Sequence, residues 1–248
     1  MDIHNKIVLI TGASSGIGEI TAKKIGRLGM TVILLSRSKN KLKVITEEIV
    51  NNGGNAEYLY LDVSSFSNFK SVIEYIKNKY GRVDILINNA GVMLLSEINE
   101  LKVDEWDQMI DVNFKGVLNG VASVLSIMRK QKSGLIINVI STAAYRVMEG
   151  SSVYSATKSA IKTFSEGLRK EEANNGIKVS LIAPGPTKTD LLTHTSSRQL
   201  SDSLVDFVDS HGLNVSDVAN TIVYQLTVND NVSIDEVVIS TSRKMNKG

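Results

Sequence analysis

The sequence has 248 residues, of which 42% are apolar and 22% charged, and this composition suits a globular chain whose core needs no disulfides. It contains no cysteine and only three histidines, which excludes thiol catalysis and argues against zinc, iron–sulfur and histidine-rich metal sites. The formal net charge of +2 and the lack of a long apolar run predict neither a nucleic-acid partner nor a membrane span. The first residues have no signal-peptide layout, so we expect a cytoplasmic protein.

Short apolar runs alternate with longer helical patterns along the chain. In order, we expect strand Ile7–Ile10, helix Ile17–Leu28, strand Thr31–Ser36, helix Lys41–Val50, strand Ala56–Leu61, helix Phe66–Tyr80, strand Val83–Ile87, one or two helices in Val103–Arg129, strand Leu135–Ile140, helix Ser155–Ala173, strand Val179–Ile182, helix Val215–Leu226 and strand Glu236–Ile239. This alternation predicts a Rossmann-type α/β fold, a doubly wound parallel sheet of about seven strands with helices on both faces. No domain boundary is visible, so we expect residues 1–248 to form one domain.

One stretch, Leu191–Gly212, is polar and only weakly periodic. It follows the predicted strand Val179–Ile182 and therefore lies at the carboxyl end of the sheet, where ligands of such folds bind. A long segment at that edge is a candidate lid, and we expect residues 187–213 to cover a substrate.

A glycine-rich turn lies between the first predicted strand and the first predicted helix. It reads Thr11–Gly18, with the glycine spacing G-x-x-x-G-x-G. Glycines let the backbone approach a pyrophosphate, and the helix N-terminus presents free N–H groups to it. The strand-turn-helix context predicts a dinucleotide site, the alternative being a turn that binds nothing. The expected contact residues are Gly12, Ser14, Ser15, Gly16, Ile17 and Gly18.

The end of the second predicted strand indicates which cofactor binds. Many dinucleotide sites place an acid there, on the ribose 2′-hydroxyl, whereas this sequence has Ser36-Arg37-Ser38. A cation attracts a 2′-phosphate and an acid repels it, so Arg37 favours NADP over NAD. Alternatively, Arg37 is a solvated residue at a strand end. Asp62, after the third strand, is a candidate partner of the adenine amino group or a cap of the next helix.

Tyr154 and Lys158 are four residues apart at the start of a predicted helix and therefore share one face of it. A tyrosine has a pKa near 10 and is a poor acid–base group at neutral pH. A nearby ammonium group lowers that pKa by favouring the phenolate. The pair could then exchange a proton with an alcohol oxygen. Alone, this spacing is common on protein surfaces and is weak evidence for catalysis. The glycine turn upstream makes a catalytic role more specific.

Together these motifs resemble the short-chain dehydrogenase/reductase family over essentially the whole chain. The matching segments are Thr11–Gly18, Asp62-Val63, Asn88–Gly91, Asn113, Ser141, Tyr154–Lys158 and Pro184-Gly185. The resemblance implies NAD(P)-dependent hydride transfer between an alcohol and a carbonyl, within a single dinucleotide-binding and catalytic domain.

The resemblance also implies a role for each matching residue. Tyr154 would be the general acid for carbonyl reduction, and Lys158 would hold the nicotinamide ribose and lower the pKa of Tyr154. Ser141 would hydrogen-bond the substrate oxygen, and Asn113 would anchor a water in a proton relay. The other cofactor contacts would be Asp62, Val63, Asn89, Ala90, Gly91, Pro184, Gly185, Thr187 and Thr189. The plain alternatives are that Ser141 caps a strand end, Asn113 bonds its own helix and Pro184-Gly185 is an ordinary loop.

The C-terminal segment and the end of the second predicted strand indicate which branch of the family and which cofactor to expect. Ile234–Thr241 lacks the Gly-Gly-containing ending usual in carrier-linked ketoacyl reductases and resembles the branch of serine, 3-hydroxy acid and clavulanate dehydrogenases. Many NADP-preferring relatives carry two consecutive basic residues where this chain has Arg37-Ser38. We expect an NADP-dependent oxidoreductase acting on a small carbonyl or alcohol. The alternatives are a nucleotide-sensing regulatory protein with the same fold and a carrier-linked 3-ketoacyl reductase.

The substrate site is expected to be mainly apolar. Met93, Tyr145 and Met148 are its predicted lining residues, and Tyr145 occupies a position that is often glycine in the family and narrows the pocket. Because methionine adapts to varied ligands and no charge is among the three, a neutral carbonyl compound is the expected substrate.

Two long predicted helices carry apolar residues over more than one stripe. They lie around Phe114–Arg129 and Ser155–Ala173, and a surface helix needs only one such stripe to meet its own sheet. Family members commonly pair these helices across a two-fold axis, so the resemblance implies a homo-oligomer, at least a dimer and more specifically a tetramer. Alternatively, the same chain covers the second stripe.

Overall fold

The centre of the molecule is a sheet of seven parallel strands. The structure is a computed structural model that describes residues 4–191, 195 and 197–242, without the side chains of residues 198–203. The strands pair in the order β3-β2-β1-β4-β5-β6-β7, and each neighbouring pair is parallel. Their bounds are β1 Ile7–Thr11, β2 Thr31–Ser36, β3 Asn55–Tyr60, β4 Ile85–Asn88, β5 Gly134–Val139, β6 Ile177–Pro184 and β7 Glu236–Ile239. This sheet confirms the predicted doubly wound architecture.

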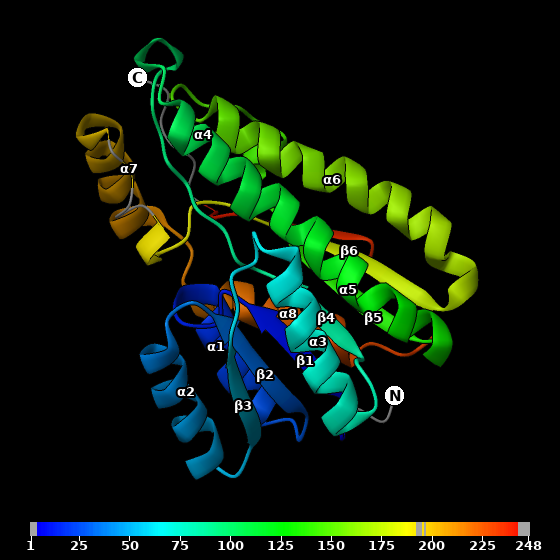
Figure 1. The fold of residues 1–248 in the computed structure, drawn as a ribbon. Coiled ribbons are helices and arrows are strands. Elements are labelled where there is room, and N and C mark those ends of the chain that lie inside the picture. The colour runs from blue at the N-terminus through cyan, green and yellow to red at the C-terminus, as the bar shows by residue number, and fades with distance from the viewer. Residues whose placement is uncertain (1–3, 192–194, 196, 243–248) are drawn as a thin grey trace.

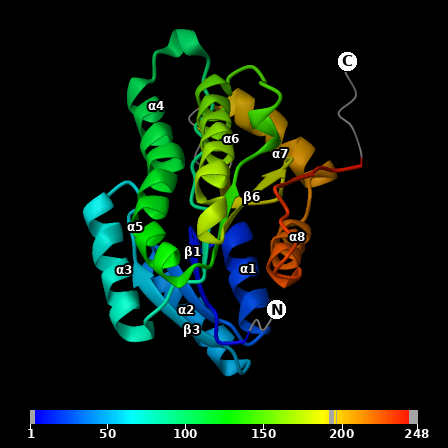
Figure 2. The ribbon, with the colours of Figure 1, turned by 90° about the vertical axis from the view of Figure 1, so that its right-hand side faces the viewer.

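Helices cover both faces of the sheet (Figures 1 and 2). One face carries α1 Gly16–Gly26, α2 Lys39–Asn51 and α8 Val215–Thr227. The other face carries α3 Phe66–Tyr80, α5 Gly116–Gln131 and α6 Ser152–Glu172. A short helix, α4 Val103–Met109, continues through a π-helical stretch, Ile110–Lys115, into α5. The described part of the chain thus has three helices on each face, as a doubly wound sheet requires.

Each central strand buries both of its faces. In β1, Ile7 and Leu9 pack on the side of α3, α5 and α6, while Val8 and Ile10 pack on the side of α1, α2 and α8. All four side chains are 4% exposed or less. This two-sided burial explains why the strands read as continuous apolar runs in the sequence.

The strand order reverses between β1 and β4. From β1 the sheet grows outward through β2 and β3, and from β4 it grows the other way through β5 to β7. Parallel strands bring the glycine turn after β1 and the segment Asn89–Gly91 after β4 to the same edge of the sheet. Ligands of open α/β sheets bind at such a reversal.

The candidate lid contains a helix that was not predicted from the sequence. This helix, α7, spans Arg198–His211. Its described apolar contacts come from Leu204, Val205 and Val208, which pack with Met93 and its neighbours. In the sequence, Leu200, Leu204 and Val208 recur every four residues, which is helical spacing, so the pattern was present but was overlooked among the polar residues around it. Residues 192–194 and 196 of the same segment lie outside the described residues.

The second apolar stripe on α5 belongs largely to the core of the chain itself. Val117, Val121, Val124 and Met128 are 5% exposed or less and pack in the cluster between the sheet and α3, α5 and α6. For these four residues the alternative of coverage by the same chain holds, while the expected homo-oligomer stays a prediction. Its exposed face carries Ala122, with the partly buried Leu118 and Leu125 beside it. Any interface with a second copy would have to use that outward face.

Candidate active site

The glycine turn has a backbone that only glycine can adopt comfortably at two positions. Gly12 has φ +65° and Gly16 has φ +56°, in the left-handed region. At Gly18 a β-carbon would lie 2.4 Å from the carbonyl oxygen of Gly12. Ser15 is the N-cap residue of α1, yet its side chain makes no capping hydrogen bond. The turn therefore leaves the N-terminal N–H groups of α1 open to an external acceptor.

Side chains from β1 and from the end of β4 brace this turn. The hydroxyl of Thr11 accepts hydrogen bonds from the N–H groups of Asn89 and Ala90, both at 3.0 Å. In return, the Asn89 amide donates to the carbonyl oxygens of Thr11, at 3.0 Å, and Gly12, at 3.2 Å. Asn89 is one of the predicted cofactor contacts, and its side-chain amide holds the glycine turn in place.

A cationic pocket lies just after β2. It is lined by Arg37, Ser38, Lys39, Asn40, Lys41 and Tyr60. The ammonium group of Lys39 lies 5.4 Å from the centre of the Tyr60 ring, which holds the lysine beside Arg37. Arg37 was the only cation predicted here. Lys39 and Lys41 follow it within four residues of sequence and line the same pocket.

Asp62 and Val63 follow β3, and both make contacts that stabilise the local structure. One carboxylate oxygen of Asp62 accepts hydrogen bonds from the backbone N–H and the hydroxyl of Ser64, at 3.0 and 2.7 Å. Val63 packs against α5, where a β-carbon on Gly116 would lie 2.9 Å from a Val63 methyl group. The N-cap of α3 is Ser65, whose hydroxyl accepts from the N–H of Asn68, so Asp62 braces the turn before the helix and does not cap it.

Tyr154 and Lys158 lie on the first turns of α6, buried at its contact with β5. Tyr154 is 6% exposed and Lys158 is 5% exposed. The Lys158 ammonium lies 5.7 Å from the centre of the Tyr154 ring and donates to the carbonyl oxygen of Val139 at 3.1 Å. A three-residue 3-10 turn, Thr142–Ala144, carries Ser141 as its N-cap, whose hydroxyl accepts from the N–H of Ala143 at 3.1 Å. The structure thus brings the three predicted side chains together at the carboxyl end of β5.

Burial shifts the pKa of both acid–base groups. Burial raises the pKa of Tyr154 to about 12, although a side-chain hydrogen bond with Ser141 acts in the opposite direction. Burial also lowers the pKa of Lys158 to about 8, because the low-dielectric surroundings disfavour its charged form. The sequence expectation of a lowered tyrosine pKa is therefore wrong for the protein by itself. Tyr154 therefore carries its proton at neutral pH.

Asn113 lies in the π-helical stretch between α4 and α5. Its side chain accepts a hydrogen bond from the N–H of Val92 at 2.8 Å and donates to the carbonyl oxygen of Val92 at 2.9 Å. It also donates to the hydroxyl of Thr157 at 3.2 Å. Beside it, a β-carbon on Gly91 would lie 3.3 Å from the Asn113 side-chain oxygen and 3.6 Å from the Lys158 nitrogen. Through these bonds, Asn113 ties the segment after β4 to α6 at Thr157, the residue directly before Lys158, and its described side-chain partners lie outside its own helix.

The segment after β6 crosses the same edge of the sheet. The N–H of Gly185 donates to the carbonyl oxygen of Ile239 at 2.7 Å, and the Thr187 hydroxyl donates to the carbonyl oxygen of Gly185 at 2.8 Å. Thr187 forms an isolated parallel bridge with Leu213, at the far end of the candidate lid. Both ends of residues 187–213 are therefore fastened to each other.

An apolar cluster lies beside Tyr154 and beneath α7. Its buried members are Met93, Leu94, Leu95, Met109, Tyr154 and Val208, and Trp106, Ala143, Val153, Leu191, Leu204 and Val205 pack against them. The Thr195 hydroxyl donates to the carbonyl oxygen of Met93 at 3.0 Å, joining the lid to this cluster. Met93 thus lies in one cluster with Tyr154, and its role in lining a substrate stays a prediction. Trp106 and Met109 were missed because α4 is short and its contacts are distant in sequence.

Two of the predicted substrate residues are in a different environment. Tyr145 and Met148 are both 43% exposed, and the Lys162 ammonium lies 5.7 Å from the centre of the Tyr145 ring. The Tyr145 ring therefore contacts the side of α6 that carries Lys162. The described structure does not place these two residues in the buried cluster with Met93.

A model of the family described as short chain dehydrogenase matches residues 6–200. The chain belongs to the short-chain dehydrogenase family. It is 38% identical to an uncharacterized oxidoreductase of Staphylococcus saprophyticus, over 97% of this chain and 98% of the relative. Membership of this family makes the chain an oxidoreductase, which confirms the expected enzyme class.

Solved structures with NADP are similar to this short-chain dehydrogenase over most of its length. The closed form of serine dehydrogenase complexed with NADP+ matches with a TM-score of 0.87 and 28% identity, covering 94% of each chain. A metagenomic short-chain oxidoreductase in complex with NADP matches with a TM-score of 0.83 and 28% identity, covering 98% of this chain and all of that one. These likenesses support a nicotinamide cofactor.

The described residues give two further findings about this short-chain dehydrogenase. They contain no group of three or more acidic or histidine side chains that could hold a metal ion. Nor does any helix among them combine the length and the apolar character needed to cross a membrane.

Proposed function

We propose that this short-chain dehydrogenase is an NADP-dependent reductase of a small, neutral carbonyl compound, working in one dinucleotide-binding and catalytic domain. The observation that carries the proposal is the buried pair of Tyr154 and Lys158 beside Ser141, at the same edge as the glycine turn. Serine dehydrogenase and the metagenomic oxidoreductase, both solved with NADP, support the cofactor.

The residues present fit a dinucleotide at three points. The glycine turn is a cradle in which a β-carbon at Gly12 would lie 2.8 Å from the α-carbon of Ala90. Arg37 and Lys39 offer cations for a 2′-phosphate. Lys158 uses one of its three N–H donors on Val139 and has the others for ribose hydroxyls. When bound, NADPH supplies the hydride.

The chain supplies the proton and holds the carbonyl. Tyr154, protonated at neutral pH, donates its proton to the carbonyl oxygen as that oxygen becomes an alcohol. Ser141 donates a second hydrogen bond to the same oxygen, while the Lys158 cation stabilises the phenolate left on Tyr154. Asn113 positions the Thr157–Lys158 turn through its bonds to Val92 and Thr157.

The lid and the apolar cluster define the substrate. Residues 187–213 cover the cluster around Met93 and are joined to it through Thr195 and Val208. Buried apolar side chains favour a neutral substrate with a short apolar chain, since an unpaired charge there is costly. We further propose that the enzyme works in the cytoplasm as a homo-oligomer, more specifically a tetramer.

A substrate panel tests this function against its alternative. Purified protein is mixed with NADPH or NADH and with small aldehydes, ketones and 3-oxo acids, and cofactor oxidation is followed by absorbance. We expect turnover that requires a carbonyl compound and is faster with NADPH. Tight NADPH binding without turnover on any compound would favour a nucleotide-sensing protein, and turnover restricted to carrier-bound acyl chains would favour a ketoacyl reductase.

A further inference from the structure

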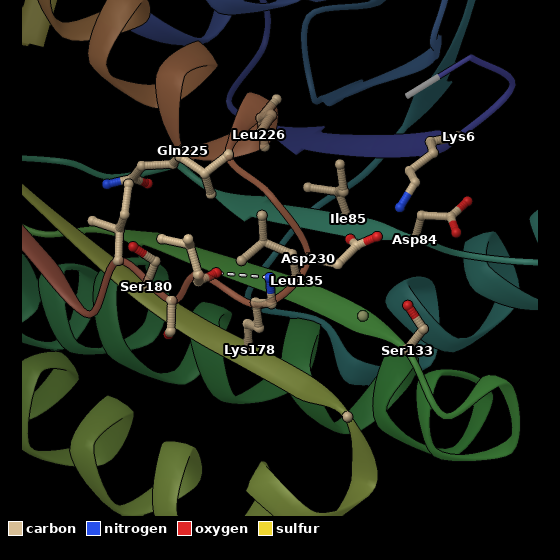
Figure 3. A pocket seen from close by; sticks show the side chains of 16 residues that line it. Lys6, Asp84, Ile85, Ser133, Leu135, Lys178, Ser180, Gln225, Leu226 and Asp230 are labelled. Carbon is tan, nitrogen blue, oxygen red and sulfur yellow. Dashed lines mark hydrogen bonds between the residues drawn. The ribbon is translucent and has the colours of Figure 1, made fainter. Parts of the chain in front are cut away.

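A second cavity lies at the edge of the sheet opposite the active site. It is bounded by the amino ends of β1, β4, β5 and β6, the last turn of α8 and the loop that follows α8. Its volume is about 50 Å³, room for roughly three or four water-sized groups. Figure 3 shows Gln225 from α8 and Ser180 from β6 at one side of this space, with Lys6 and Asp84 at the other.

Two buried side chains in this cavity have hydrogen-bonding atoms that the fold does not use. Gln225 is 4% exposed and Ser180 is 2% exposed. Among the described residues, neither the amide nitrogen nor the amide oxygen of Gln225 has a partner, and neither does the Ser180 hydroxyl. Buried polar atoms almost always find partners, because leaving them unpaired is unfavourable. Their immediate neighbours Ile222 and Leu226 are apolar, so packing alone did not require a glutamine here.

The charges around the cavity favour an anion. Lys178 is two residues before Ser180 on β6 and therefore points to the same side of the sheet. Its ammonium donates to the carbonyl oxygen of Val232 at 2.8 Å, which leaves two N–H donors. The carboxylate of Asp84 is already bound by Arg82, whose Nε lies 2.8 Å from it, and by the N–H of Ile7 at 2.9 Å. Lys6 adds a second cation, against one exposed acid, Asp230.

We propose that this cavity is a binding site for a small planar oxyanion that also carries an O–H donor, the chemistry of hydrogencarbonate. Such an ion has four heavy atoms, which suits the volume. Its oxygens would accept hydrogen bonds from the Gln225 nitrogen, the Ser180 hydroxyl and Lys178, and its O–H would donate to the Gln225 oxygen. All three unused atoms of Gln225 and Ser180 then have partners. The site is independent of the proposed cofactor, which would bind at the carboxyl ends of the strands.

Ligand-dependent stability tests the proposal without an activity assay. The full chain is unfolded thermally at about pH 8 in increasing sodium hydrogencarbonate, with chloride balancing ionic strength. A ligand that binds only the folded state raises the midpoint by mass action, so we expect a saturable rise. Acetate, which lacks a donor, and acetamide, which lacks a charge, should give less. An equal rise with chloride alone, or a stronger one with acetamide, would overturn the anion site.

Matched variants locate the effect. Gln225→Met keeps the length of the side chain and removes both unused atoms, so it should fold at least as stably and lose the hydrogencarbonate response. Ser180→Ala and Lys178→Met should weaken the response, whereas Lys70→Met, on the exposed side of α3, makes the same charge change and should leave it intact. Line broadening of ¹³C-hydrogencarbonate by the parent protein, and its loss in Gln225→Met, gives a second readout. Parent and Gln225→Met responding alike would refute the proposal.

Discussion

The methyl group of Thr189 lies against Gly16, so close that a β-carbon at position 16 would be 3.3 Å from it. The segment after β6 therefore touches the glycine turn after β1, across the edge where the pyrophosphate of a dinucleotide would lie. The candidate lid begins beside this contact, which joins two residues that are far apart in the sequence.

Gly16→Ala should weaken NADPH binding more than it weakens the fold. A left-handed alanine costs about 1–2 kcal/mol, and the added carbon also presses on Thr189 and on the cofactor surface. Gly81→Ala is the matched control, because Gly81 has φ +72° at the C-cap of α3 and no neighbour within 4 Å of an added β-carbon. Both variants should lose similar stability in urea titrations, and only Gly16→Ala should raise the Kd for NADPH, by about tenfold or more. Unchanged NADPH binding in Gly16→Ala would show that the turn does not hold the cofactor.

Tyr154→Phe removes one hydroxyl and should abolish most catalysis. A positioned general acid contributes roughly 10²–10⁴-fold, so kcat should fall by at least that range while the Kd for NADPH stays nearly constant. Tyr224→Phe makes the same change at a residue on α8 that is 60% exposed, and it should keep full activity. Near-normal turnover by Tyr154→Phe would rule out the proposed proton donor.

Arg37→Asp should shift cofactor preference from NADPH towards NADH. It replaces attraction to a 2′-phosphate by repulsion, and a lost charge-assisted contact is worth roughly 1.5–3 kcal/mol, about ten- to a hundredfold in affinity. Lys43→Asp makes the same change in charge six residues later, on α2, at a side chain paired with Glu47 at 3.8 Å and outside the cationic pocket. The ratio of kcat/KM for the two cofactors should move only in Arg37→Asp. A parent protein that already prefers NADH would remove the basis for the argument.

Local patterns predicted the fold because they repeat along the chain, whereas the surroundings of the site depend on distant contacts. The buried strands are continuous apolar runs, and the Tyr154–Lys158 spacing is visible within five residues. The brace from Thr11 to Asn89 joins residues 78 positions apart, and no local pattern encodes it. The raised pKa of Tyr154 likewise follows from burial, which a sequence does not display. Helix α7 was missed although Leu200, Leu204 and Val208 have helical spacing, because the residues around them are mostly polar.

Lys158→Met should stabilise the cofactor-free protein while removing its activity. The pKa of Lys158 is lowered from 10.5 to about 8, so at neutral pH the folded protein holds a buried charge at a cost of roughly 3 kcal/mol. Methionine avoids that cost but leaves the carbonyl oxygen of Val139 without its donor, so we expect a net gain of about 1–3 kcal/mol in the free energy of unfolding.

The gain should depend on pH with a definite sign. As the pH rises from about 8 towards 10.5, the folded parent loses the Lys158 proton while the unfolded chain still holds it, so the parent becomes relatively more stable. The advantage of Lys158→Met should therefore shrink over that window in denaturant titrations. Lys162→Met, one turn further along α6, removes a lysine that forms an ion pair with Glu166 and is the matched control for the loss of one ammonium group. A Lys158→Met protein less stable than its parent at neutral pH would contradict the burial argument.

Self-association should use the outward face of α5 and α6, since Val121 and its neighbours are already in the core. The two helices lie side by side on one face of the molecule (Figure 2). Ala122 is an exposed residue of α5. Ala122→Glu introduces a charge at this position. In a monomer the charge is solvated by water, whereas in an interface it would be buried without a partner, which is unfavourable. Val44→Glu, at a 63% exposed residue of α2, is the matched control. Light scattering at micromolar concentration should give at least twice 27.0 kDa for the parent and for Val44→Glu, and a smaller assembly for Ala122→Glu. A parent mass near 27.0 kDa would show that the chain is a monomer and that its own core accounts for the second apolar stripe.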